Sequence, residues 1–193
     1  MPSAYLLVYY IDPAGDRHVL LGHKNIIGVR LNGVRSRDQM IWNNAGQWAI
    51  PGGRAKSREA PAVAAMREFA EETAIDFRDP AVLAMYSGGF VPSTHRGTGF
   101  SVTYVRIVPG MAATLAGAIT TNITNARPLD DELHEVRWFA KPDAAGQFGY
   151  APIPPPAGTW LETQYNAATD PAVRDNKMRG PFDWFQEGLI NLP

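Results

Sequence analysis

The 193-residue chain contains no cysteine. This absence excludes disulfide bonds, thiolate catalysis and zinc sites built on cysteine ligands. The chain also carries almost no net charge, because 18 Lys and Arg residues are balanced by 19 Asp and Glu residues. No general positive field is therefore available to attract nucleic acid, and we expect no nucleic-acid partner.

Long apolar runs are missing as well. The first residues, MPSAYLLVYYID, have no basic start, and their apolar run of about seven residues ends at Asp12 and Pro13, which is typical of a strand and not of a signal peptide. No segment reaches the roughly 20 apolar residues that a membrane-spanning helix needs. We therefore expect a cytoplasmic protein without a membrane partner. With 45% hydrophobic residues, the chain fits one domain with extensions.

What the sequence does contain is an acidic helix. Glu68, Glu71 and Glu72 follow the spacing i, i+3, i+4, so their carboxylates project from one side of a helix, opposite Met66 and Phe69. Three like charges on one stripe repel each other, so folding alone gives no reason for the arrangement. Hard divalent ions such as Mg²⁺ and Mn²⁺ prefer carboxylate oxygens. The stripe therefore indicates a metal site, with a solvated surface as the alternative.

The residues around the stripe support the metal site. The run Trp48-Ala49-Ile50-Pro51-Gly52-Gly53 ends in a turn whose glycines let the backbone approach a ligand closely. Pro61 suits the first position of a helix, where its missing N–H is not needed. Arg67 precedes Glu71 by four residues and can offset part of the repulsion between the glutamates.

The stretch from Gly53 to Ile75, GRAKSREAPAVAAMREFAEETAI, resembles the Nudix box, G-x5-E-x7-R-E-U-x-E-E-x-G-U, in which U is a bulky apolar residue. Every defined position matches except the last glycine, which is Ala74. An alanine that keeps the left-handed geometry of that glycine costs on the order of 1 kcal/mol. Ala60, before the helix, lacks a capping side chain, which costs about another 1 kcal/mol. Both departures concern stability, because all charged positions of the box are intact.

The resemblance implies an α/β fold, namely an α/β/α sandwich with a mixed β-sheet and a loop–helix–loop catalytic motif. It also implies metal-dependent hydrolysis of a diphosphate linkage, with Mg²⁺ or Mn²⁺ as the cofactor and a small nucleotide as the substrate. A homodimer is left open. The expected catalytic residues are Arg67, Glu68, Glu71 and Glu72. The expected metal ligands are Gly53, Glu68, Glu71, Glu72 and an acid from a loop opposite the box, Glu132, with Asp130 and Asp131 as its alternatives.

The substrate is less constrained. Pro92 lies 17 residues past the box, close to the offset that is typical of ADP-sugar pyrophosphatases in the family, so ADP-ribose or a sugar nucleotide is slightly favoured. A nucleoside triphosphate pyrophosphohydrolase and a non-catalytic nucleotide-sensing module are the alternatives. Trp42, Trp160 and Tyr165 can stack on a base, although packing is the favoured role for each. The candidates for substrate binding are Arg54, Glu59, His95 and Arg96.

The remaining pattern predicts how the chain is organised. Residues 1–145 form the Nudix domain, with a locally basic insertion at 24–47, and residues 110–130 give no clear prediction. Residues 146–193 form a connector, proline-rich at Pro152–Pro156, and a helical extension within Pro171–Ile190 that packs on the same domain. The expected strands are Tyr5–Ile11, Arg17–His23, Trp48–Ile50, Val82–Phe90, Phe100–Val108 and Leu133–Phe139, with a loop at Val91–Gly99.

Overall fold

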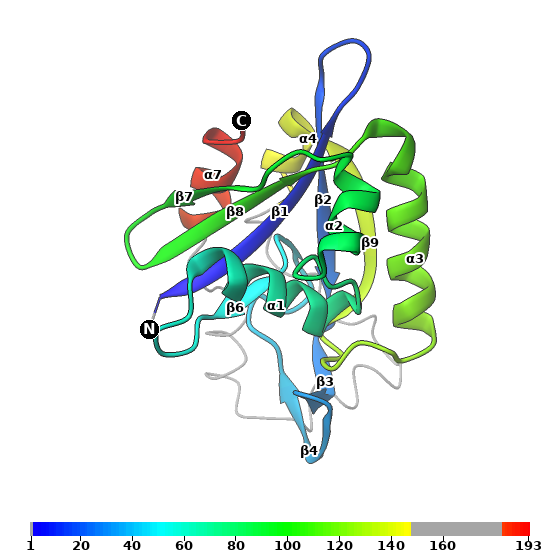
Figure 1. Ribbon diagram of the computed structural model, residues 1–193. Helices are drawn as coiled ribbons and strands as arrows, with labels where there is room; N and C mark the ends of the chain where they lie inside the picture. The colour runs from blue at the N-terminus through cyan, green and yellow to red at the C-terminus, as the bar shows by residue number, and fades with distance from the viewer. Residues whose placement is uncertain (1, 148–182) are drawn as a thin grey trace.

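A computed structural model describes residues 2–147 and 183–193 of the protein, which form a β-sheet between two layers of helices (Figure 1). The strands are β1 (Ser3–Ile11), β2 (Arg17–Lys24), β3 (Ile27–Leu31), β4 (Val34–Ile41), β5 (Trp48–Ala49), β6 (Gly52–Arg54), β7 (Ser93–Arg96), β8 (Phe100–Arg106) and β9 (Leu133–Ala140). The helices are α1 (Pro61–Thr73), α2 (Pro80–Ser87), the 3-10 turn η1 (Pro109–Met111), α3 (Ala112–Thr124), α4 (Lys141–Ala145) and α7 (Asp183–Ile190).

The main sheet is mixed. Its strands follow the order β5-β2-β1-β8-β7, with β6 paired to β1 and β9 paired to β2. Strands β1 and β8 run parallel, whereas the other pairs of this sheet are antiparallel. Together with the helices on both faces, this topology confirms the predicted α/β/α sandwich.

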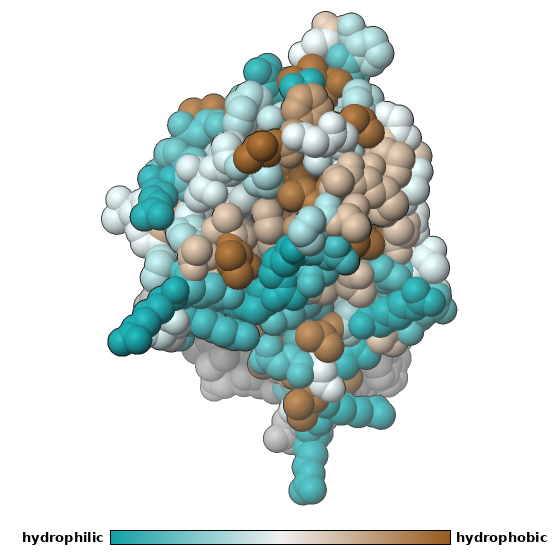
Figure 2. All heavy atoms as spheres, in the orientation of Figure 1, coloured by the Kyte–Doolittle hydropathy of each residue, from teal (hydrophilic) through white to brown (hydrophobic). Residues whose placement is uncertain are grey.

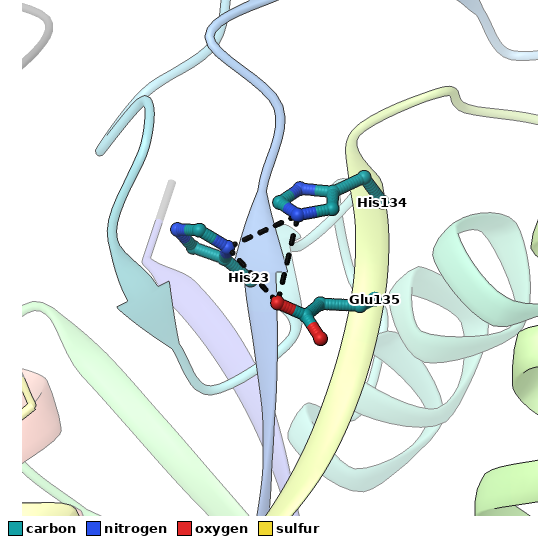
Figure 3. A group of neighbouring side chains, drawn as sticks. All are labelled: His23, His134 and Glu135. Atoms are coloured by element: carbon teal, nitrogen blue, oxygen red, sulfur yellow. Dashed lines mark hydrogen bonds and ion pairs between the residues drawn. The ribbon is translucent and has the colours of Figure 1, made fainter. Parts of the chain in front are cut away.

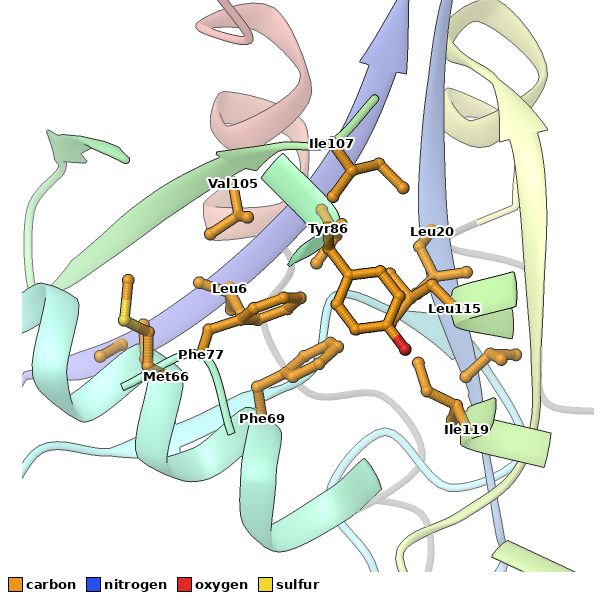
Figure 4. Packing of buried hydrophobic residues seen from close by; sticks show 14 of the residues in the cluster. Leu6, Leu20, Met66, Phe69, Phe77, Tyr86, Val105, Ile107, Leu115 and Ile119 are labelled. Atoms are coloured by element: carbon orange, nitrogen blue, oxygen red, sulfur yellow. The ribbon is translucent and has the colours of Figure 1, made fainter. Parts of the chain in front are cut away.

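The two faces of the sheet carry separate hydrophobic cores. Along β1, Leu6 and Val8 point to the core under α1, α2 and α3, whereas Leu7 and Tyr9 point to the core under α4 and α7. This is the alternation that a strand imposes on its side chains. Figure 4 shows the first core, where Phe69 of α1 lies among residues of β1, β8 and α3. Full burial of such a side chain contributes roughly 1.5–3 kcal/mol, so this core fixes α1 against the sheet.

The prediction of a strand at Val82–Phe90 is wrong, because residues 82–87 lie in α2 and residues 88–90 follow its end. The carboxylate of Asp79 accepts the N–H of Ala81 at 2.8 Å and caps the helix, and Pro80 occupies its first turn. At the other end, Gly88 takes the left-handed conformation with φ 60°. A short apolar run does not by itself distinguish a strand from a helix, and here the residues at both ends decide for the helix.

Three other segments contain regular structure that was not predicted. Residues 24–47 include β3 and β4, a two-stranded hairpin that projects from the body at the bottom of Figure 1. Its turn is Asn32-Gly33 with φ 52° and 74°, the positive values that a two-residue hairpin turn requires. Strand β7 lies within the expected loop Val91–Gly99, and α3 lies within 110–130. The other five predicted strands coincide with β1, β2, β5, β8 and β9.

The end of the chain is described only from Asp183 onward. There α7 packs Trp184, Phe185 and Leu189 into the second core. The connector Pro152–Pro156, Trp160, Tyr165 and the beginning of the predicted helical segment at Pro171 lie outside the described residues, and the division at residue 145 stays a prediction. No helix within residues 2–147 or 183–193 combines the length and the apolar character that crossing a bilayer requires.

The outer surface differs between the helices of the first layer. In the orientation of Figure 1, hydrophilic surface follows α1 and the β3–β4 hairpin, whereas more apolar surface covers α2 and α3 (Figure 2). The polar side of the box helix is therefore continuous with the hairpin.

Candidate active site

The box residues form a loop and a helix whose ends have unusual geometry. Before α1, Ala60 is extended with φ −66° and ψ 141° and provides no side-chain cap. After α1, Ala74 takes the left-handed conformation with φ 56°, and its N–H donates to the carbonyl of Ala70 at 2.8 Å. The alanine thus keeps the geometry that the resemblance assigns to a glycine, and it bears the cost of a left-handed Cβ.

Arg67 joins the loop to the helix through a network of ion pairs. Its Nε and Nη2 donate to the two carboxylate oxygens of Glu59 at 2.9 and 3.0 Å, and its Nη1 lies 2.8 Å from both Glu68 Oε1 and Glu71 Oε2. Nη2 also donates to the carbonyl of Arg54 at 3.1 Å. The hydrogen bonds from Arg67 lower the pKa of Glu59 to about 2. Arg67 is itself buried, so it holds Glu68 and Glu71 of the helix and Glu59 of the preceding loop in place.

Glu72 is the most deeply buried acid of the box, with 1% of its surface exposed. Its Oε1 accepts the N–H of Gly52 at 2.9 Å, which ties α1 to β6. Its Oε2 has no hydrogen-bond partner among the described residues. Burial, and then the charge of Glu132, raise the pKa of Glu72 well above its ordinary value. One carboxylate oxygen of Glu72 is therefore left without the partner that a buried acid normally has.

Lys24 supplies the cation that accompanies these acids. Its ammonium pairs with Glu132 Oε1, and only 7% of the residue is exposed. Burial acts to lower the pKa of Lys24, but the charges of Glu132 and Glu72 outweigh it, so the pKa is raised. Lys24 stands at the end of β2 and Glu132 stands just before β9, and the pairing of these two strands brings them together.

A cavity of about 440 Å³ opens beside this cluster. Gly53 lies at its wall, and a Cβ on Gly53 would stand 2.4 Å from Glu68 Oε2, so the glycine lets the backbone and the carboxylate meet. Burial raises the pKa of Glu68, although Arg67 opposes this effect. The residues that line the cavity include Tyr5, Lys24, Trp42, Gly52, Gly53, Arg54, Glu68, Asp130 and Glu132.

The residues of this cluster fit a divalent metal ion. The free oxygen of Glu72, the carboxylate of Glu68 and the adjacent backbone of Gly53 offer oxygen atoms of the kind that Mg²⁺ and Mn²⁺ bind. In addition, burial raises the pKa of both Glu72 and Glu68, and repulsion from the charge of Glu132 raises both pKa values further. A metal ion at this position would relieve that repulsion.

The three acids of the loop before β9 have different environments. The carboxylate of Asp131 accepts the N–H groups of Val29 and Arg30 at 2.9 and 3.1 Å, so it fastens β3 and is not among the residues that line the cavity. Asp130 and Glu132 do line it. Burial raises the pKa of Asp130 to about 6. Of the three alternatives, the structure therefore brings Asp130 and Glu132 to the box.

Two candidates for substrate binding lie elsewhere. His95 is on β7, where its Nε2 is 3.3 Å from Glu187 Oε2 on α7. His95 and its neighbour Arg96 are not among the described residues that line the cavity, whereas Arg54 is. Glu59 is occupied by Arg67 and by the N–H of Lys56 at 2.8 Å. The roles of Arg54, Glu59, His95 and Arg96 in substrate binding stay predictions.

The sequence points to Lys24 only as part of the basic stretch 24–37, which could attract phosphate, and not as a partner of the box acids. Lys24 lies at the end of a strand and outside any motif, and its partner Glu132 is far along the chain. The signal that could have found it is the register of β2 against β9, which a single sequence does not provide. Trp42, considered for base stacking, lines the cavity but is only 6% exposed, which leaves little of its ring to a ligand.

Residues 16–161 of the chain match the model of the NUDIX domain. No curated protein matches the chain. Among solved structures, it is similar to a mutT/nudix family protein from Listeria innocua, with 17% identity over 75% of this chain and 80% of that chain and a TM-score of 0.42. It is also similar to a Nudix hydrolase from M. Smegmatis, with 18% identity over 93% and 87% and a TM-score of 0.39. A third similar structure is a C. elegans Ap4A hydrolase, with 16% identity over 85% and 91% and a TM-score of 0.36.

Proposed function

The chain belongs to the Nudix family and is a pyrophosphohydrolase of that family, and we propose that it hydrolyses the diphosphate linkage of a nucleoside diphosphate joined to a second group. The observation that supports this most directly is the unpartnered Oε2 of Glu72, held at 1% exposure beside the charges of Glu132 and Lys24. An unpartnered buried oxygen destabilises a fold, whereas a metal ion in a phosphate-cleaving site would give that oxygen a partner. ADP-ribose or a sugar nucleotide is the favoured substrate, and this preference rests on the position of Pro92.

We propose that Glu68, Glu72 and the backbone of Gly53 hold Mg²⁺ or Mn²⁺, with Glu71 and Glu132 completing the set. A divalent ion bound there supplies positive charge at the phosphate oxygens and lowers the pKa of water. Arg67 acts as a positioning residue, since it holds Glu71 at 2.8 Å and braces the loop through Glu59.

The chain's own residues have separate tasks in this scheme. Lys24 borders the cavity, and its compact ammonium is suited to a phosphate oxygen once a metal ion balances the charge of Glu132. A carboxylate oxygen of the Glu68 and Glu72 cluster accepts the proton from the attacking water. Arg54 lines the same cavity and is exposed, and its guanidinium can form a bidentate pair with a phosphate group.

A panel of nucleotides incubated with Mg²⁺, with release of monophosphates as the readout, tests the proposal. ADP-ribose should yield two monophosphates, and nucleoside triphosphates should react slowly. The Glu72→Gln variant should lose activity by at least about 100-fold, since a preorganised charge at a transition state is worth that much. Glu187→Gln, on the 46% exposed side chain of α7, is the matched control.

Three outcomes would contradict parts of this scheme. Wild-type rates in Glu72→Gln would remove the catalytic assignment of the cluster. Faster turnover of triphosphates than of ADP-ribose would replace the favoured substrate with the triphosphate alternative. Tight binding of nucleotides without any cleavage would identify a sensing module.

A further inference from the structure

A second group of metal-binding side chains lies between β2 and β9, separate from the carboxylates of the box. His23 comes from the end of β2, and His134 and Glu135 come from the beginning of β9; Figure 3 shows the three pointing toward one another. The strand register explains how two consecutive residues of β9 face one residue of β2. His23 pairs with Glu135, but Lys24 pairs with Leu133, so His134 is the extra residue of a β-bulge. Bulges re-aim side chains in this way.

The three ligand atoms are separated by similar distances. His23 Nδ1 lies 3.2 Å from His134 Nε2 and 3.4 Å from Glu135 Oε1, and His134 Nε2 lies 3.6 Å from Glu135 Oε1. Ligands at the usual zinc distances of about 2.0–2.2 Å, placed at tetrahedral angles, are separated by about 3.3–3.6 Å. The triangle therefore already has the size of one face of a tetrahedral site.

The second polar atoms of His23 and Glu135 are engaged elsewhere. His23 Nε2 lies 3.1 Å from the carbonyl of Gly46, which can only accept a hydrogen bond, so Nε2 carries the proton and Nδ1 presents its lone pair. Glu135 Oε2 accepts from Arg137 Nη2 at 3.1 Å, which leaves Oε1 for the centre of the triangle. The ring of His23 also stacks on Trp48 with centroids 4.7 Å apart. Such outer contacts fix metal ligands in metalloproteins.

We propose that His23, His134 and Glu135 bind one zinc ion, or a similar transition-metal ion, at a site distinct from the carboxylate cluster. Two imidazoles and one carboxylate favour zinc over Mg²⁺, which prefers oxygen ligands throughout. The side chains are 26%, 47% and 34% exposed, so a fourth position is open to solvent. None of the three lines the active-site cavity, although His23 adjoins Lys24 and His134 follows Glu132 by two residues. The ion would tie β2 to β9 beside that cavity.

Calorimetric titration of the full chain without a polyhistidine tag tests the site, with Zn²⁺ added in the presence of excess Mg²⁺. One ion should bind, and His134→Asn should weaken binding by at least about 100-fold, because loss of an outer-shell partner alone typically costs 10–100-fold. His18→Asn is the matched control, since His18 lies on the same strand, is 23% exposed and contacts Asp12 instead. Visible absorption of bound Co²⁺ gives a second readout that is independent of catalysis, and its intensity should indicate tetrahedral coordination.

The double variant Glu68→Gln/Glu72→Gln separates this site from the proposed active site. It should keep Zn²⁺ binding while it loses hydrolysis, whereas His134→Asn should keep the Mg²⁺-dependent hydrolysis in the absence of zinc. Equal Zn²⁺ affinity in His134→Asn and the wild type would overturn the proposal. So would loss of Zn²⁺ binding in the double variant but not in His134→Asn, because the ion would then occupy the carboxylate cluster. Glu135→Gln, which keeps the contact to Arg137 possible, provides an independent ligand variant if His134→Asn fails to fold.

Discussion

Replacing Glu72 by Gln should stabilise the metal-free protein at the same time as it removes activity. The glutamine retains a carbonyl oxygen that can accept the N–H of Gly52, and it removes a buried negative charge that lies close to Glu132. The amide still leaves one polar atom without a partner, but a charged group in that position costs more than the about 1–3 kcal/mol of a neutral one. Lys24 keeps its pairing with Glu132, so we expect a net gain of about 1–2 kcal/mol in the free energy of unfolding, or about 2–8 °C in Tm for a domain of this size.

Thermal unfolding with a chelator and with Mg²⁺ measures this effect. Mg²⁺ should raise the Tm of the wild type, because a ligand that binds only the folded state stabilises it, but it should raise that of Glu72→Gln much less. Glu59→Gln is the matched control with the opposite sign. It weakens hydrogen bonds to Arg67 and to the N–H of Lys56, each to a charged acceptor, and should cost about 1–3 kcal/mol. A Glu72→Gln protein that is less stable than the wild type and still hydrolyses nucleotides would refute the reasoning.

Three further changes test the ends of α1 and the docking of α7. Ala74→Gly should raise the free energy of unfolding in urea by about 1 kcal/mol, because Ala74 holds the left-handed φ of 56°. An unchanged urea midpoint would mean that this conformation costs the alanine nothing. Ala60→Ser should raise the free energy of unfolding by about 1 kcal/mol by capping α1, and slower amide exchange in the first turn of α1 would show that the cap has formed. Tyr104 donates to the carbonyl of Gly188 at 3.1 Å, and burial raises its pKa to about 12. The neutral phenol of Tyr104 therefore contributes fully to the free energy of unfolding below pH 10, and up to about 2–3 kcal/mol of that contribution is lost as the pH rises toward 12. Tyr104→Phe should reduce this loss of stability at high pH, while it costs about 0.5–1.5 kcal/mol at pH 7.

The part of the fold that could be predicted is the part whose signals are local. The box helix follows from the spacing of Glu68, Glu71 and Glu72 and from Pro61, and α1 begins and ends where those residues indicate. β1 and β8 follow from runs of β-formers. At Val82–Phe90 the apolar run alone favours a strand, whereas the signals at its two ends, Asp79-Pro80 and Gly88, favour the helix that forms. The turn Asn32-Gly33 is likewise a local signal, typical of a hairpin, within a segment that was predicted as a loop.

The pairing of Lys24 with Glu132 and the histidine cluster could not be predicted, because both depend on which residues of β2 and β9 face each other. His23 and His134 are separated by 111 positions in the chain, and no local pattern states that they meet. Without the bulge, a one-residue change of register would turn His134 to the other face of the sheet. The same bulge places Lys24 beside the loop that carries Glu132. The pairing of these two strands therefore determines the cation beside the box and the geometry of the histidine site together, so a substitution that shifts this register should impair both.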